Sequence, residues 1–246
     1  MTATSLADKH KKQKQEKLTI KSQDSKPDNQ GSSFSGQKPL MRGRLHQAAF
    51  FVTILFGVYL TIAAPRVWPR IAMVVYTLGV GGMFGTSTLL HRGKWSPKTF
   101  RVVRRFDHAM IFSAIAGTYT AVGLILPPIT RTVMLSVVWG GAIVGVLIRV
   151  FWMGAPRWAV ITPYVAVGWM AAAVFPGLYH GLGITGFILL ALGGLIYTLG
   201  AVVYAKKRPD PWPRVFGFHE VFHLCTVVAA TLFAIDVATV VLPRIS

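Results

Sequence analysis

Long apolar runs, separated by short polar or proline-containing stretches, recur along the chain from His46 onward. Seven runs of 18 to 23 residues lie at about 46–64, 71–90, 108–126, 132–152, 158–175, 184–204 and 220–242. At 1.5 Å per residue, a helix of this length crosses the ~30 Å hydrocarbon core of a bilayer. The runs are too long and too uniformly apolar for barrel strands. The pattern therefore predicts an all-α integral membrane protein, a bundle of seven transmembrane helices.

The first 45 residues have a different pattern. They contain almost no large apolar side chains and hold ten Lys and Arg against four Asp and Glu. Such a segment cannot bury enough apolar surface to order itself. We also expect no signal peptide, because no apolar run follows the basic start within the first thirty residues. We expect a disordered basic tail over 1–45 and a seven-helix domain over 46–246.

Lys and Arg predict how the helices are oriented. If the helices alternate in direction, one side carries the tail and twelve further basic residues: Arg92, Lys94, Lys98, Arg101, Arg104, Arg105, Arg149, Arg157, Lys206, Lys207, Arg208 and Arg214. The other side carries four: Arg66, Arg70, Arg131 and Arg244. Because basic loops stay in the cytoplasm, we expect a cytoplasmic N-terminus, an outside C-terminus and a multi-pass protein of the plasma membrane.

Composition limits the partners. The chain is 53% hydrophobic and only 14% charged, whereas soluble domains are about 25% charged. In so apolar a chain, the net charge of +18 is best explained by anionic lipid headgroups rather than nucleic acid. One cysteine, Cys225, cannot form an internal disulfide, so nothing indicates an oxidising compartment.

Histidines and one aspartate lie at the cytoplasmic ends of three predicted helices. His219 and His223 are four residues apart in the H-E-x-x-H pattern, so on a helix both rings project from one face. His91, from the second run, would supply a third nitrogen, and three protein ligands with an open fourth position are typical of catalytic Zn²⁺. Asp107 would hydrogen-bond a water there, and Ser87 would orient His91 or hold a substrate carbonyl. The alternative is a helix start with interfacial histidines and no metal.

Glu220, inside the same motif, has two interpretations. It reaches a metal-bound water, as the general base of soluble metalloproteases does, or it pairs with Arg214 or another loop cation. An intramembrane protease would need a metal-binding Asp on a later helix. Only Asp236, near the outer side, follows the motif, so the sequence disfavours a protease.

Three motifs resemble those of the hemolysin III family, within the progestin and adipoQ receptor (PAQR) superfamily. They are STLLH at 87–91, FDHA at 106–109 with IAGTYT at 115–120, and GFHEVFH at 217–223. The resemblance covers about residues 38–242 and extends to a wider group of seven-span hydrolases that includes alkaline ceramidases. It implies zinc ligands at His91, His219 and His223, with Asp107 near the bound water and Ser87 beside the first ligand.

The first predicted helix departs from that family. Many members have an acidic residue and an Asn ahead of a histidine there, whereas this chain has Arg42 and Arg44 ahead of His46. The role of the first helix, and of His46, therefore stays open.

Two functions remain open from the sequence. The first is a zinc-dependent hydrolase that cleaves an amide or ester of a membrane lipid, as ceramidases do. The second is a non-enzymatic protein stabilised by zinc, which acts in cytolysis by pore formation or in membrane homeostasis or sensing. A single seven-helix chain with few polar faces does not resemble a pore, so lysis would require an oligomer.

Overall fold

The computed structural model describes residues 39–152 and 157–245. The predicted tail lies outside these residues as far as position 38. The described residues form helices and no strand. The elements are α2 (Arg44–Ala63), α3 (Val67–Arg92), α4 (Pro97–Val122), η1 (Gly123–Ile125), α5 (Pro128–Phe151), α6 (Arg157–Gly168), η2 (Trp169–Val174), α7 (Phe175–Lys206), α8 (Phe218–Asp236), the π-helical η3 (Val237–Val241) and α9 (Leu242–Ile245).

Proline and capping residues set several helix starts. Pro97 and Pro128 are the first residues of α4 and α5, where a missing N–H costs nothing because the first turn has no partner for it. Ser96 caps α4, and its hydroxyl accepts a hydrogen bond from the Thr99 backbone N–H at 3.2 Å. The polar junction ahead of α4 therefore ends one long helix and starts the next.

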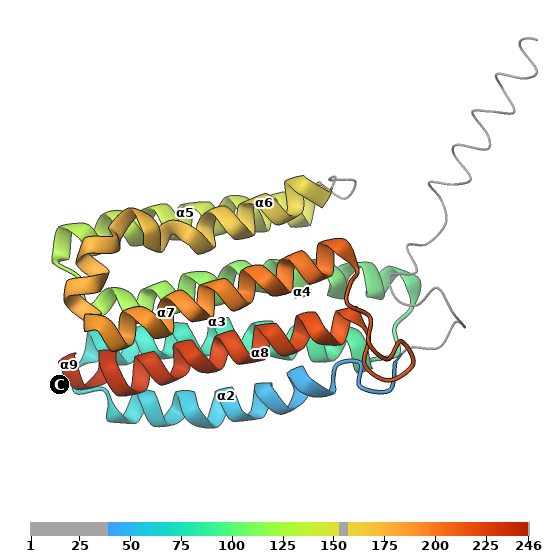
Figure 1. Cartoon of the computed structure of the whole chain (residues 1–246), viewed down its shortest axis with the longest axis horizontal. Helices are drawn as coiled ribbons and strands as arrows, with labels where there is room; N and C mark the ends of the chain where they lie inside the picture. Colours follow the sequence, from blue (N-terminus) through green and yellow to red (C-terminus); the bar gives the residue numbers. More distant parts are fainter. Residues whose placement is uncertain (1–38, 153–156, 246) are drawn as a thin grey trace, which may run out of the picture. The chain divides into compact units, whose positions relative to one another are not determined.

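The described residues contain six, not seven, continuous helical runs long and apolar enough to cross a membrane. The predicted fifth and sixth helices lie in one run, Thr162–Lys206, of 45 residues. A straight helix of that length would extend about 68 Å, roughly twice the hydrocarbon core. The run is not straight, because it passes through η2 and breaks at Gly183, whose φ is 65°. In Figure 1, α6 and α7 run in opposite directions on either side of this break. Seven crossings stay a prediction.

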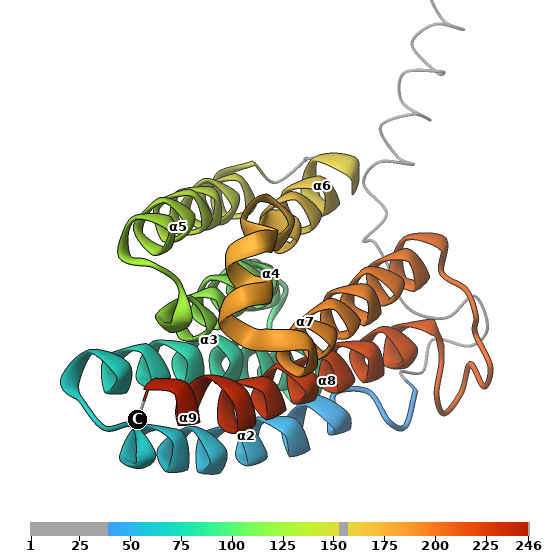
Figure 2. The same ribbon diagram turned by 60° about the vertical axis from the view of Figure 1, so that its left-hand side comes forward.

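The helices pack as a series that closes on itself. Each of α2 to α6 packs against the next helix in the chain, and α8 packs against both α7 and α2. Figures 1 and 2 show the α5–α6 pair on one side of α4 and the α2, α3 and α8 group on the other. The last long helix thus lies beside the first, which brings together segments about 175 residues apart in sequence.

Small residues allow α3 and α4 to approach closely. A Cβ added at Gly79 would lie 2.4 Å from the Ser113 carbonyl oxygen, and one at Gly117 would lie 2.9 Å from that of Val75. Close backbone packing at small residues is typical of membrane helices. Large apolar side chains are exposed on the outer faces of the helices, for example Leu55 at 73% and Ile129 at 81%. This arrangement fits a protein surrounded by lipid.

The start of α2 and the α3–α4 and α7–α8 junctions lie at the same end of the helical unit (Figure 1). These are the segments that the sequence analysis assigned to the basic, cytoplasmic side. Residues 39–43, which that analysis placed in the tail, belong to the helical unit Pro39–Ser246. The amides of Leu40 and Met41 bond to the loop before α8, so the helical unit includes residues ahead of the first apolar run.

Candidate metal centre

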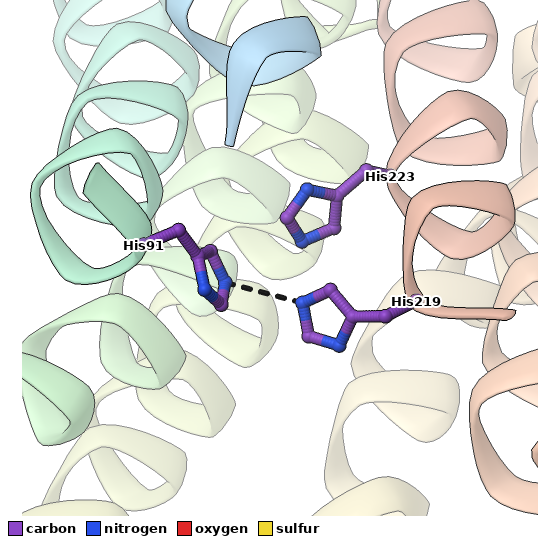
Figure 3. A group of neighbouring side chains, drawn as sticks. All are labelled: His91, His219 and His223. Atoms are coloured by element: carbon purple, nitrogen blue, oxygen red, sulfur yellow. Dashed lines mark hydrogen bonds between the residues drawn. The ribbon is translucent and has the colours of Figure 1, made fainter. Parts of the chain in front are cut away.

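Three histidine rings converge at this end of the helical unit. His91 comes from the last turn of α3, and His219 and His223 come from the first two turns of α8 (Figure 3). One nitrogen from each ring lies within 4.8 Å of the other two. The sequence predicted this group, and the structure brings all three of its members together.

The spacing of the rings fits a shared cation. The Nε2 atoms of His91 and His219 are 3.1 Å apart. Two nitrogens bound tetrahedrally to zinc at 2.0–2.1 Å would be about 3.3 Å apart. His219 and His223 are 8% and 3% exposed, so their nitrogens have little access to bulk water. Three imidazoles form a donor set that suits zinc.

The start of α8 fixes both of its histidines. Gly217 is the N-cap residue, and its backbone N–H donates to Glu220 Oε2 at 3.0 Å. The next amide, of Phe218, donates to Asp210 Oδ1 at 2.8 Å. Both contacts satisfy amides that the first turn of a helix leaves unpaired. The helix therefore begins at a defined residue, and His219 and His223 follow on one face.

Glu220 points into an ion pair. Its Oε1 accepts a hydrogen bond from Arg42 Nε at 2.5 Å, and its carboxylate is fully buried. Because Oε2 takes the Gly217 N–H, each carboxylate oxygen already has a donor. Of the two interpretations drawn from the sequence, the structure agrees with pairing to a cation. That cation is Arg42, ahead of the first helix, and not Arg214.

Ser87 and Asp107 lie across the α3–α4 interface from one another. Ser87 is one turn before His91 and is buried, and its hydroxyl interacts with the Asp107 carboxylate. Asp107 is outside the three-histidine group that the described residues form. The contact links the α4 carboxylate to the face of α3 that carries His91.

His108, the neighbour of Asp107, has other partners. Its Nδ1 contacts the Arg149 guanidinium of α5, and the Tyr164 hydroxyl donates to its backbone oxygen at 2.9 Å. These contacts tie His108 to α5 and α6.

His46 joins the group in a way that the sequence left open. Its ring stacks on His223, with centroids 3.8 Å apart and planes 8° from parallel. It is 3% exposed, and neither ring nitrogen has a hydrogen-bond partner within the described residues. The sequence does place a histidine at the start of the first predicted helix. It does not show that α2 packs against α8, which is what brings His46 to His223.

The fold and site define a multi-pass membrane protein with a buried cluster of histidines at one end of its helices. Comparison with known proteins agrees: the family described as haemolysin-III related matches residues 34–234. The chain is 30% identical to hemolysin-3 of Bacillus cereus over 178 residues, which cover 72% of this chain and 78% of the relative. It is 27% identical to a hemolysin-3 homolog of Bacillus subtilis (strain 168) over 198 residues, 77% of this chain and 88% of the relative. The chain belongs to the hemolysin III family.

Proposed function

We propose that His91, His219 and His223 bind one zinc ion, and that the protein uses it to hydrolyse an amide or ester of a membrane lipid. The observation that carries this proposal is the convergence of three imidazole nitrogens within 4.8 Å. They come from two helices more than 120 residues apart in sequence and lie at one end of a lipid-facing bundle. Three protein ligands leave a fourth position open, as in catalytic zinc sites.

The residues around the group suit hydrolysis. Zinc at this position would supply Lewis acidity toward a carbonyl group and activate water near neutral pH. Asp107 would accept the proton released in the attack, and the facing Ser87 hydroxyl would orient its carboxylate. Glu220 does not compete for this role, because both of its oxygens already accept hydrogen bonds. A lipid substrate would enter sideways between helices whose outer faces are apolar.

A second function follows from the names of the relatives. Both are called hemolysins, which refers to lysis of red cells. In this alternative, zinc only ties α3 to α8, and the protein lyses or senses membranes without hydrolysis. The burial of His223 supports the alternative, because a structural site needs no access for substrate.

Zinc content per chain is the first test. Protein purified in detergent without chelators is expected to hold about one zinc ion, and the His219→Ala/His223→Ala variant is expected to hold none. His180→Ala is the matched control, because His180 lies on α7 outside the three-histidine group. Wild-type protein that stays free of zinc after supplementation would refute both the hydrolase and the zinc-tied alternative.

Asp107→Ala separates the two functions. If Asp107 works on the water, the variant keeps zinc but loses hydrolysis of lipid amides and esters, measured by mass spectrometry of proteoliposomes. Leakage of an encapsulated dye is measured in the same vesicles. Leakage without hydrolysis in the wild type would favour the cytolytic alternative, in which the protein acts as an oligomer.

We also propose seven crossings, with the N-terminus in the cytoplasm and the protein in the plasma membrane. The turn back between α6 and α7 (Figure 1) supports seven, and the basic junctions at one end support the orientation. These junctions would contact anionic lipid headgroups. Two variants of a Cys225→Ser protein test this, one with a single cysteine between α3 and α4 and the other with a single cysteine between η1 and α5. An impermeant thiol reagent added to intact cells should label only the second variant.

A further inference from the structure

A short segment ahead of the first helix crosses the end of the bundle where the histidines meet. We call residues 39–43 the strap. Two consecutive strap amides, of Leu40 and Met41, donate to the carbonyl oxygens of Arg214 and Val215, both at 3.2 Å. Those two carbonyls belong to the loop that leads into α8. The strap is therefore fixed to the loop before the first turn of that helix.

The next strap residue, Arg42, reaches α8 itself. Its guanidinium Nε is 2.5 Å from Glu220 Oε1, and both side chains are buried, at 8% and 0% exposure. Glu220 follows His219 directly and also caps the helix through Gly217. The buried charge pair therefore ties the strap to the turn of α8 that carries the first histidine.

The last strap residue, Gly43, rests on α3. A Cβ added at Gly43 would lie 2.9 Å from His91 Cβ and 3.2 Å from Arg92 Cγ. The strap backbone thus passes directly over the last turn of α3, where the third histidine sits. One segment of five residues contacts both helices that supply the histidines.

We infer that the strap holds the three histidines at metal-binding spacing, with Arg42 as a positioning residue that does not touch the metal. The inference rests on the proposed zinc site. Without Arg42, the Glu220 carboxylate would be buried without its cationic partner. Burying an unpaired charge is strongly unfavourable. The first turn of α8 would then rearrange to reach water. His219 would leave its place beside His91, whereas His223, one turn deeper, would keep its position.

The test measures zinc affinity by competition with a chromogenic chelator, using the full chain in detergent. Arg42→Ala is expected to bind zinc about 10–100-fold more weakly, as loss of groups that support metal ligands usually does. Arg44→Ala removes the same charge two residues away from an exposed side chain, and is expected to stay within about twofold of the wild type. Arg42→Lys keeps the charge and should recover part of the loss.

A spectrum and a double-mutant cycle exclude a general loss of stability. Protein loaded with Co²⁺ should show weaker visible absorption in Arg42→Ala than in Arg44→Ala, because a displaced His219 changes the coordination geometry. In a Glu220→Gln background, Arg42→Ala should weaken zinc binding less than it does alone, because glutamine still accepts a hydrogen bond but no longer forms an ion pair with Arg42. Wild-type affinity and spectrum in Arg42→Ala, or additive effects in the cycle, would overturn the inference.

Failure of the strap and failure of the zinc site give different results. If the wild type binds no metal, the proposed function fails, and amide hydrogen exchange of metal-free protein still tests the strap. Exchange of residues 214–223 should then be faster in Arg42→Ala and unchanged in Arg44→Ala. Unchanged exchange in both variants would overturn the strap by itself. Should Arg42→Ala fail to fold, Arg42→Lys and Glu220→Gln carry the same comparison.

Discussion

Replacing Gly43, the N-cap residue of α2, by alanine should destabilise the protein more than such a substitution at a helix start usually does. Gly43 has φ +76°, and an L-residue in this left-handed region costs about 1–2 kcal/mol. The added methyl group would also lie 2.9 Å from His91 Cβ. That atom is next to the backbone of α3 and cannot turn away, so overpacking adds about 1–3 kcal/mol. We expect Gly43→Ala to lower the free energy of unfolding by about 2–5 kcal/mol.

Gly140→Ala is the matched comparison. Gly140 lies inside α5, and a Cβ there would meet no atom within 4 Å among the described residues. The same substitution should therefore raise the free energy of unfolding by about 0.5–1 kcal/mol, the usual gain for alanine in a helix. Thermal unfolding of both variants in the same detergent, followed by circular dichroism, measures the difference.

The effect of Gly43→Ala should also reach the metal site. Because the methyl group presses on His91, zinc affinity is expected to fall together with stability, while Gly140→Ala leaves the affinity unchanged. Gly43→Ala protein as stable as the wild type would refute the reasoning. It would show that the strap does not lie on α3 with this backbone conformation.

Three further substitutions test separate contacts. Glu220→Gln keeps an acceptor for Arg42 but loses the charge, so the free energy of unfolding should fall by about 1–3 kcal/mol. Hydrolysis at saturating zinc should persist. Loss of hydrolysis without loss of stability would instead show that Glu220 acts as a general base. Asp236 is fully buried, and neither of its oxygens has a hydrogen-bond partner within the described residues. Asp236→Asn, which keeps the shape of the side chain without its charge, should therefore raise the melting temperature. A lower melting temperature would show that the Asp236 carboxylate has a stabilising partner. The Tyr119 hydroxyl donates to the Gly168 carbonyl oxygen and accepts from the Ala171 N–H, both at 2.7 Å. Tyr119→Phe should therefore cost about 1–3 kcal/mol in chemical denaturation, and no change would show that these two bonds add nothing.

Helices and the three-histidine group were both predictable from sequence, for different reasons. Apolar runs of bilayer length leave the backbone no other way to satisfy its hydrogen bonds, so α2 to α5 and α8 follow from composition. The offset between His219 and His223 places both rings on one face of any helix. His91 joined them in the prediction because alternating helices put its end of α3 on the same side of the membrane.

The path of the chain over Thr162–Lys206 was predicted only in part. The sequence indicated two helices there, at 158–175 and 184–204, whereas the structure continues α6 through η2 into α7. The run turns at Gly183 with φ +65°. The gap between the two predicted helices, 176–183, ends at this turn, but hydropathy does not show that α6, η2 and α7 follow one another without a loop.

The sequence by itself determined a helical membrane protein with its histidines at one end, because helix length, hydropathy and residue spacing are local properties. Only the tertiary structure decided the partners of the charged and aromatic groups. Arg42 pairs with Glu220 across 178 residues, and His46 stacks on His223. Both contacts exist because α8 packs against α2. That packing depends on the shapes of all the helices together, which no local pattern specifies.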